Sequence, residues 1–156
     1  MLKVSIPGRG TWELEHLLLD VNGTLSLDGQ LLPGVAERLA RLKQNLRVRL
    51  LTADTFGRGR SLSEELGVSL QKVTPPSEDH AKEAVVHELG SENVVAIGNG
   101  ANDVRMLRAA RLGIAVLGPE ATASEAFQAA DVLVPDIRVA LDLLLNPKRL
   151  VATLRR

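Results

Sequence analysis

Short apolar runs alternate along the sequence with segments in which apolar residues recur at helical spacing. The run His-Leu-Leu-Leu-Asp over residues 16–20 is typical of a buried strand that ends in an acid. After Pro33, residues Val35, Leu39 and Leu42 share one helical face, so a helix is predicted there. The same two patterns predict further strands over 46–52, 68–73, 93–98, 112–117 and 131–134, and further helices over 60–66, 103–110, 120–129 and 136–145.

One more helix is predicted between Ser77, its expected N-cap, and Gly90, where it stops. The apolar stripe expected on this helix consists of Ala81, Val85 and Leu89. Lys82 falls within the same helix, where a single lysine is typical of the solvated face.

Repeated strand–helix units of this length predict a parallel sheet with helices on both faces. The first fifteen residues differ, because segments 2–6 and 11–15 flank a Pro-Gly-Arg-Gly turn and predict a short β-hairpin. No internal repeat or linker divides the chain. We therefore expect a single domain over residues 1–156, an α/β three-layer sandwich with a parallel, Rossmann-like sheet.

Composition excludes several kinds of site. The 156 residues include no cysteine, which excludes disulfides, thiol catalysis and cysteine-ligated zinc. Nineteen basic residues balance nineteen acidic ones, and aromatic residues make up only 2% of the chain, so no nucleic-acid partner is expected. The sequence has no signal-peptide core and no apolar run near the ~20 residues that span a bilayer, so we expect a cytoplasmic protein without a membrane partner.

Polar residues follow three of the predicted strands at the point where each strand ends. These segments are 20–24 (Asp-Val-Asn-Gly-Thr), 52–54 (Thr-Ala-Asp) and 98–103 (Gly-Asn-Gly-Ala-Asn-Asp). The carboxyl ends of parallel strands meet at one edge of the sheet, where ligands bind. Taken singly the residues are ordinary, since Asn-Gly pairs favour turns and an acid at a strand end is typical of a cap. Their order along the chain is what indicates a site.

That order resembles the four motifs of the haloacid dehalogenase (HAD) superfamily. Residues 20–25, then Thr52, then Lys82, then 98–103 follow one another as those motifs do. The last motif continues as Val-Arg-Met-Leu and Ala-Ala-Arg-Leu-Gly-Ile-Ala-Val, which is similar to the phosphorylation domain of P-type ATPases. Over residues 16–135 the chain resembles the small stand-alone members described as soluble P-type ATPase-like HAD proteins.

The resemblance implies phosphoryl transfer with Mg²⁺ as the cofactor. Asp20 would attack phosphorus and carry an aspartyl-phosphate, and Thr52 would donate its hydroxyl to a phosphoryl oxygen. Lys82 would pair with Asp20 and with the transferring group and so neutralise charge. The residues implied to bind substrate are Gly23, Thr24, Ala53 and Asp54. The implied metal ligands are Asp20, the backbone carbonyl of Asn22, Asn99 and Asp103.

Two asparagines stand where the family usually has acids. Asn22 occupies the position of an aspartate that protonates the leaving group and activates water, and losing such a group costs about 10²–10⁴-fold in rate. Asn99 replaces an aspartate that binds the metal directly. We therefore expect a slow phosphatase that favours activated esters or anhydrides.

The alternative is a catalytically degenerate HAD fold that acts as a phosphate-binding or regulatory module. A response-regulator receiver fits less well, because receivers carry an acidic pair at the first strand.

Motif spacing leaves no room for a cap domain over the site. Only 31 residues separate Asp20 from Thr52, and only 15 separate Lys82 from Gly98. An open site of this kind suits phosphorylated small molecules and phosphorylated macromolecules alike. The N-terminal hairpin and the basic tail are candidate surfaces for a homo-oligomer; the basic residues of the tail are Lys148, Arg149, Arg155 and Arg156.

Overall fold

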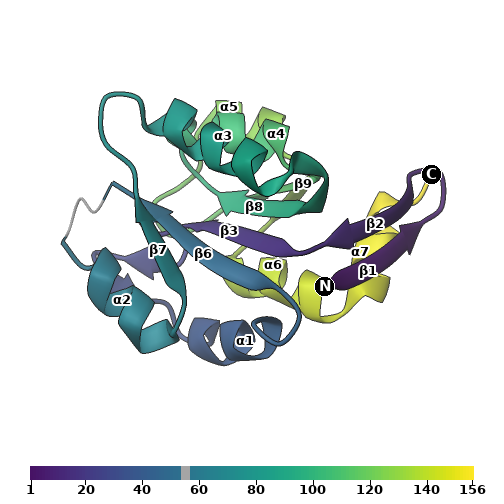
Figure 1. The fold of residues 1–156 in the computed structure, drawn as a ribbon, viewed down its shortest axis with the longest axis horizontal. Helices are drawn as coiled ribbons and strands as arrows, with labels where there is room; N and C mark the ends of the chain where they lie inside the picture. The colour runs from purple at the N-terminus through teal and green to yellow at the C-terminus, as the bar shows by residue number, and fades with distance from the viewer. Residues whose placement is uncertain (54–56) are drawn as a thin grey trace.

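The computed structural model describes residues 1–53 and 57–156, and its centre is a six-stranded parallel sheet (Figure 1). The strands lie in the order β10-β9-β8-β3-β6-β7, and each pairs in parallel with its neighbour. Their bounds are β3 His16–Asp20, β6 Arg47–Thr52, β7 Ser69–Lys72, β8 Val94–Gly98, β9 Leu112–Val116 and β10 Val132–Val134. The predicted parallel sheet is confirmed.

Helices cover both faces of the sheet (Figure 1). One face carries α3 (Glu78–Leu89), α4 (Val104–Ala109) and α5 (Ser124–Ala129). The other face carries α1 (Val35–Leu42), α2 (Gly59–Leu66) and α6 (Ile137–Leu145). Two short 3₁₀ turns, η1 (Ser91–Asn93) and η2 (Ala101–Asp103), flank β8. The molecule is therefore the three-layer α/β sandwich that the sequence predicts.

The central strand β3 has both faces buried. Leu17 and Leu19 pack into the core under α1 and α6, whereas Leu18 packs into the opposite core under α3 and α4. Successive side chains of a strand point to opposite faces, so three consecutive leucines can line two separate cores. This burial explains why β3, β8 and β9 are continuous apolar runs rather than alternating patterns.

The predicted N-terminal hairpin is also confirmed, as β1 (Leu2–Ile6) paired antiparallel with β2 (Gly10–Leu14). The segment expected to be a basic tail is instead a helix, α7 (Pro147–Leu154), which lies beside β1 (Figure 1). Pro147 begins this helix, and Leu150 and Leu154 are buried one turn apart. Its basic residues obscured this apolar pair in the sequence.

Neither segment that could hold a cap domain does so. Between β3 and β6 the chain forms only the small hairpin β4 (Ser26–Leu27) and β5 (Gln30–Leu31), followed by α1. Between α3 and β8 it forms only the turn η1. The carboxyl edge of the sheet is therefore open, as predicted. Within residues 1–53 and 57–156, no helix has the length and hydropathy needed to cross a membrane.

Candidate active site at the carboxyl edge of the sheet

Three neighbouring strands bring the predicted motifs to one point. Asp20 ends β3, Thr52 ends β6 and Gly98 ends β8, and β3 lies between the other two. A cavity of about 210 Å³ opens beyond these strand ends. Its lining residues are Asp20, Asn22, Thr52, Ala53, Glu78, Asn99, Gly100, Asn102 and Glu120. Segments distant in sequence thus meet where a parallel sheet normally binds its ligand.

Lys82 reaches this point from α3 and is fully buried. Its Nζ donates to Asp20 Oδ1 at 2.8 Å and to Asp103 Oδ1 at 2.6 Å. The buried face of α3 consists of Lys82, Val85 and Val86, while Ala81 and Leu89 are only half-buried. The expected stripe was therefore misplaced by part of a turn, and the solvated position expected for Lys82 taken alone is wrong. The hydroxyl of Ser77, the expected N-cap, makes no capping hydrogen bond.

Burial and charge set the protonation of this buried group of three side chains. Burial of Asp20, reinforced by the nearby Asp103 carboxylate, raises the pKa of Asp20 to about 7, although Lys82 and the Thr24 hydroxyl oppose the shift. Burial disfavours the charged form of Lys82, but its attraction to Asp20 and Asp103 is stronger and raises the pKa of the ammonium above its ordinary value. Lys82 is therefore a permanent cation between two acids.

Asp103 is tied to the protein through both of its oxygens. Oδ1 accepts from Lys82, and Oδ2 accepts from the backbone N–H groups of Asn99 and Gly100, each at 2.9 Å. A side chain at Gly98 would place its Cβ 2.4 Å from Asp103, so this close approach requires glycine. Asp103 is fully buried and does not line the cavity. In this arrangement it orients Lys82 and the loop after β8, and its role as a direct metal ligand stays a prediction.

Thr24 and Asn99 complete the polar contacts around Asp20. The Thr24 hydroxyl lies 3.1 Å from Asp20 Oδ2 and 3.1 Å from Asn99 Oδ1. Asn99 Nδ2 donates to the carbonyl of Ala121 at 3.0 Å, which leaves Asn99 Oδ1 directed toward Thr24. The amide of Asn99 therefore presents oxygen, not nitrogen, to the neighbourhood of Asp20.

The remaining predicted residues lie at the same edge of the sheet. Asn22 and Ala53 line the cavity, and Thr52 lines it while being almost wholly buried. Gly23 has a φ of 77°, and its N–H donates to the carbonyl of Ser26 at 2.8 Å, which closes the turn after β3. Asp54, predicted to contact substrate, lies outside the described residues.

The donor set of the cavity fits Mg²⁺. Its lining side chains offer carboxylate, amide and hydroxyl oxygens and no sulfur or imidazole, which suits a hard cation. In the described part of the chain, no three acidic, histidine or cysteine side chains are grouped closely enough to form a metal cage. Asp20 and Asn99 are thus the candidate side-chain ligands, with water in the remaining positions, and Mg²⁺ commonly retains several waters.

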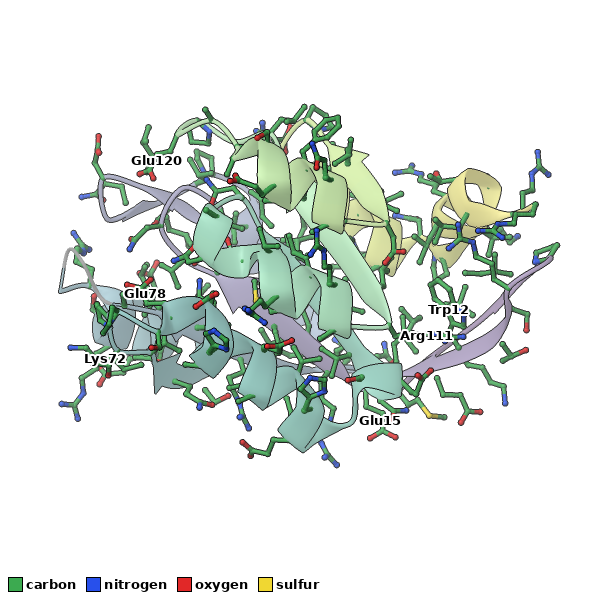
Figure 2. The ribbon with its side chains drawn as sticks, turned by 90° about the horizontal axis from the view of Figure 1, so that it is seen from above. Trp12, Glu15, Lys72, Glu78, Arg111 and Glu120 are labelled. Carbon is green, nitrogen blue, oxygen red and sulfur yellow. The ribbon has the colours of Figure 1, made fainter. Side chains whose placement is uncertain are left out.

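Glu78 and Glu120 also line the cavity, and the sequence analysis missed both (Figure 2). Glu78 is the first residue of α3, and its carboxylate accepts from Asn102 Nδ2 at 2.7 Å. Glu120 follows β9 in a loop, whereas a helix was predicted from residue 120; α5 begins only at Ser124. Pro119 and the positive φ of Ala121 explain the late start. The rule about carboxyl ends of strands, applied to β9 as well, would have indicated Glu120.

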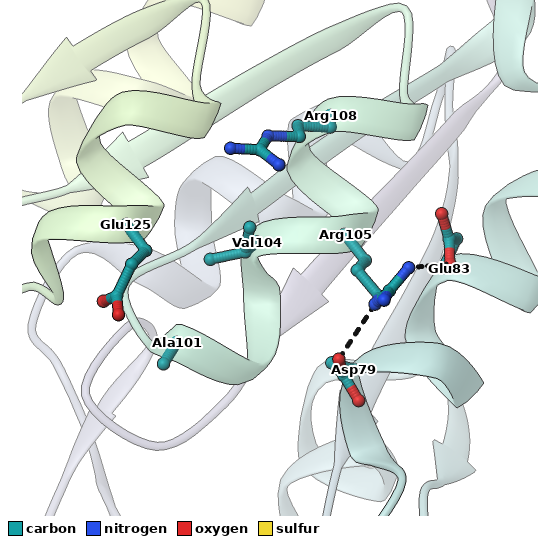
Figure 3. A pocket seen from close by; sticks show the side chains of 7 residues that line it. All are labelled: Asp79, Glu83, Ala101, Val104, Arg105, Arg108 and Glu125. Atoms are coloured by element: carbon teal, nitrogen blue, oxygen red, sulfur yellow. Dashed lines mark hydrogen bonds and ion pairs between the residues drawn. The ribbon is translucent and has the colours of Figure 1, made fainter.

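A larger hollow of about 440 Å³ lies between α3, α4 and α5 (Figure 3). There Arg105 donates to Asp79 at 3.0 Å and to Glu83 at 3.3 Å. The hollow shares no lining residue with the cavity at Asp20. The cavity at the strand ends, although smaller, is the one lined by Asp20, Thr52 and Asn99 of the motifs.

The fold and the site together define a capless α/β protein of the haloacid dehalogenase type. The chain belongs to this family: the model of the haloacid dehalogenase-like hydrolases matches residues 9–111. The matched region includes Asp20, Thr52, Lys82, Asn99 and Asp103. The resemblance inferred from the ordered motifs is therefore confirmed.

Relatives of known sequence include P-type ATPases. An uncharacterized protein of Methanocaldococcus jannaschii is 48% identical over 83 residues, which are 51% of this chain and 89% of the relative. The zinc-exporting P-type ATPase of Mycobacterium marinum is 38% identical over 108 residues, which are 64% of this chain but only 14% of the ATPase. This chain thus corresponds to a small part of that transporter.

Among solved structures, a similar one is the 3-deoxy-D-manno-octulosonate 8-phosphate phosphatase of Moraxella catarrhalis, in complex with magnesium ion, phosphate ion and the sugar acid. The TM-score is 0.67 at 20% identity, and the match covers 91% of this chain and 94% of that chain. At this level of identity the likeness establishes a shared fold.

Proposed function

We propose that this protein is a Mg²⁺-dependent phosphohydrolase that works through an aspartyl-phosphate on Asp20. The observation that carries the proposal is the buried contact of Asp20 with Lys82, at the floor of a cavity lined by oxygen donors. Membership of the haloacid dehalogenase-like hydrolases supports the reaction class.

Each side chain of the site has a distinct part in the proposed reaction. A carboxylate oxygen of Asp20 bonds to phosphorus while the bond from phosphorus to the leaving group breaks; water then attacks phosphorus and releases phosphate and free Asp20. Lys82 offsets the repulsion between the nucleophile and the phosphoryl group, and the Thr52 hydroxyl donates to a phosphoryl oxygen. Mg²⁺, held by Asp20 and by the oxygens of Asn22 and Asn99, would supply further charge neutralisation.

Asn22 limits the leaving groups that this site can expel. It lines the cavity next to Asp20, but its amide cannot exchange a proton at neutral pH. Aryl and acyl phosphates have leaving groups that need little protonation, so we propose that such activated compounds are the preferred class. The absence of a cap leaves the site open to small and macromolecular phosphorylated substrates.

The change Asn22→Asp is expected to accelerate hydrolysis of the aspartyl-phosphate, by up to about 10²–10⁴-fold, because a carboxylate at this position can activate water. Decay of the phosphoenzyme formed from radiolabelled acetyl phosphate measures this rate. The matched control is Asn22→Ser, which also removes the amide but adds no acid. Equal decay rates in the two variants would show that position 22 does not limit hydrolysis.

A phosphate-binding module without catalysis is the second candidate, because Asn22 and Asn99 both replace acids in the cavity. Such a module would bind inorganic phosphate but would not react at Asp20. The two candidates therefore differ in whether the carboxylate of Asp20 can form a bond to a phosphoryl group.

Beryllofluoride separates the two candidates, since it mimics a phosphoryl group bonded to a reactive carboxylate. With Mg²⁺ and beryllofluoride at about 100 times Kd, the stabilisation of about 2.7 kcal/mol should raise the melting temperature by about 5–10 °C. Asp20→Asn should abolish this increase and retain any effect of inorganic phosphate. A wild-type protein that responds to phosphate but not to beryllofluoride would favour the binding module.

A further inference from the structure

The loop 117–123 between β9 and α5 contacts two parts of the site, Asn99 and the turn that follows Asn22. Ala121 O accepts from Asn99 Nδ2 at 3.0 Å, and Ala123 N donates to Asn99 O at 2.9 Å. A Cβ on Gly118 would lie 2.5 Å from the carbonyl oxygen of Gly23, so the loop packs directly on the turn after β3. The position of this loop is therefore set by the site itself.

Glu120 projects from this loop over Gly23. A Cβ placed on Gly23 would lie 2.7 Å from Glu120 Oε2 and also 2.7 Å from Asn99 Nδ2. Gly23 thus leaves open a space that the Glu120 carboxylate and the Asn99 amide share. The carboxylate lies beside the residue at which the site has lost a negative charge.

Glu120 is also free to interact with a ligand. Its side chain is exposed and lines the same cavity as Asp20, and within residues 1–53 and 57–156 it has no hydrogen bond or ion pair. The other carboxylates of the site are engaged: Asp20 and Asp103 by Lys82, and Glu78 by Asn102. Among the carboxylates that line the cavity, Glu120 is the one that makes neither a hydrogen bond nor an ion pair within the described residues.

We propose that Glu120 supplies the negative charge that Asn99 lacks, by accepting hydrogen bonds from water bound to a Mg²⁺ ion held at Asp20 and Asn99. A role through water agrees with the lack of a closed cage of three acids in the described site. Carboxylates that orient the ligands of a metal typically change its affinity about 10–100-fold. The inference rests on the proposed function only in requiring the same cation.

Titration of MgCl₂ into the metal-free full chain, followed by calorimetry, tests this proposal without reference to turnover. Glu120→Gln is expected to raise the Kd for Mg²⁺ at least about 10-fold. The matched control Glu125→Gln removes an equal charge from α5, outside the cavity, and should change Kd less than about twofold (Figure 3). Restoring a carboxylate with Asn99→Asp in the Glu120→Gln background should recover the affinity.

Three results would overturn the role of Glu120: an unchanged Kd in Glu120→Gln, an equal loss in Glu125→Gln, or no Mg²⁺ binding by the wild-type chain. Turnover of p-nitrophenyl phosphate in the same samples keeps the two proposals apart. A wild-type chain that turns over, with an unchanged Kd in Glu120→Gln, overturns the role of Glu120 alone. A chain that binds Mg²⁺ through Glu120 but neither reacts at Asp20 nor turns over overturns only the phosphohydrolase.

Discussion

Replacing Asp20 with asparagine is expected to reduce turnover of p-nitrophenyl phosphate by at least about 10³-fold and to abolish the phosphoenzyme. The amide is a far weaker nucleophile than the carboxylate, and none of the other described carboxylates of the cavity adjoins Lys82 as Asp20 does. The substitution keeps the shape of the side chain, so the fold should be retained. It also removes a carboxylate whose charged form is disfavoured by burial, which raises the pKa of Asp20 to about 7. Release of p-nitrophenol with Mg²⁺ and acid-quench labelling measure the two effects.

Asp131→Asn provides the matched control for this prediction. Asp131 precedes β10 at the opposite edge of the sheet, and its carboxylate accepts from the backbone N–H of Gly113, which an amide oxygen can also do. Turnover of p-nitrophenyl phosphate by the Asp131→Asn variant should equal that of the wild-type chain. Equal turnover in Asp20→Asn and the wild type would contradict the aspartyl-phosphate mechanism.

Replacing Lys82 with methionine is expected to destabilise the fold by about 3–5 kcal/mol, because it leaves two buried carboxylates without their cation. Methionine matches the aliphatic stem of lysine, so packing on α3 should change little. Asp20 and Asp103 would both remain buried, each having lost its hydrogen bond to Nζ. Urea unfolding at pH 8 measures the loss. The loss should shrink as the pH falls toward about 7, because Lys82 lowers the pKa of Asp20 and its removal lets the buried carboxyl group of the variant bind a proton above the wild-type value of about 7. Below about 7 both proteins bind this proton, and the loss should level off.

The double change Lys82→Met with Asp103→Asn tests the cause of that loss. Removing one of the two charges should recover part of the stability, since the remaining buried repulsion disappears. Lys148→Met, on the exposed side of α7, should change stability by less than about 0.5 kcal/mol. A double variant no more stable than Lys82→Met would show that the ion pairs are not the source of the loss.

Most of the sheet could be predicted because its strands are buried on both faces. In β3, β8 and β9 every or nearly every side chain enters a core, and a short apolar run between polar turns has few other interpretations. Helix ends that are set by a residue next to them in the sequence could be predicted equally well. Gly67, for example, ends α2 in the left-handed conformation at a φ of 61°.

The predictions were wrong where a contact between segments distant in sequence overrides the local pattern of apolar and polar residues. Lys82 breaks the apolar periodicity of α3, because its ammonium is satisfied by acids on two other segments. In α7, basic residues surround Leu150 and Leu154, and their burial depends on α7 packing beside the N-terminal hairpin. Glu120 was assigned to a helix, whereas its loop is held by hydrogen bonds to Asn99 that depend on the tertiary structure.

By itself the sequence determined the layered fold, a parallel sheet between two layers of helices, and the family. Both can be read from short stretches of sequence, because a strand buried on both faces is a continuous apolar run and the motifs follow one another in a fixed order. It also located the two asparagines that replace acids. The family resemblance implied that Lys82 pairs with Asp20, but only the tertiary structure shows how this contact is made and which other charges lie beside it. Lys82 and Asp20 are 62 residues apart, and their contact at 2.8 Å depends on where β3 lies in the sheet and on which side α3 packs. The same strand order turns Asp103 inward and brings Glu120 over Gly23. The local sequence does not reveal these meetings, because electrostatic interactions depend on distance in space and not along the chain.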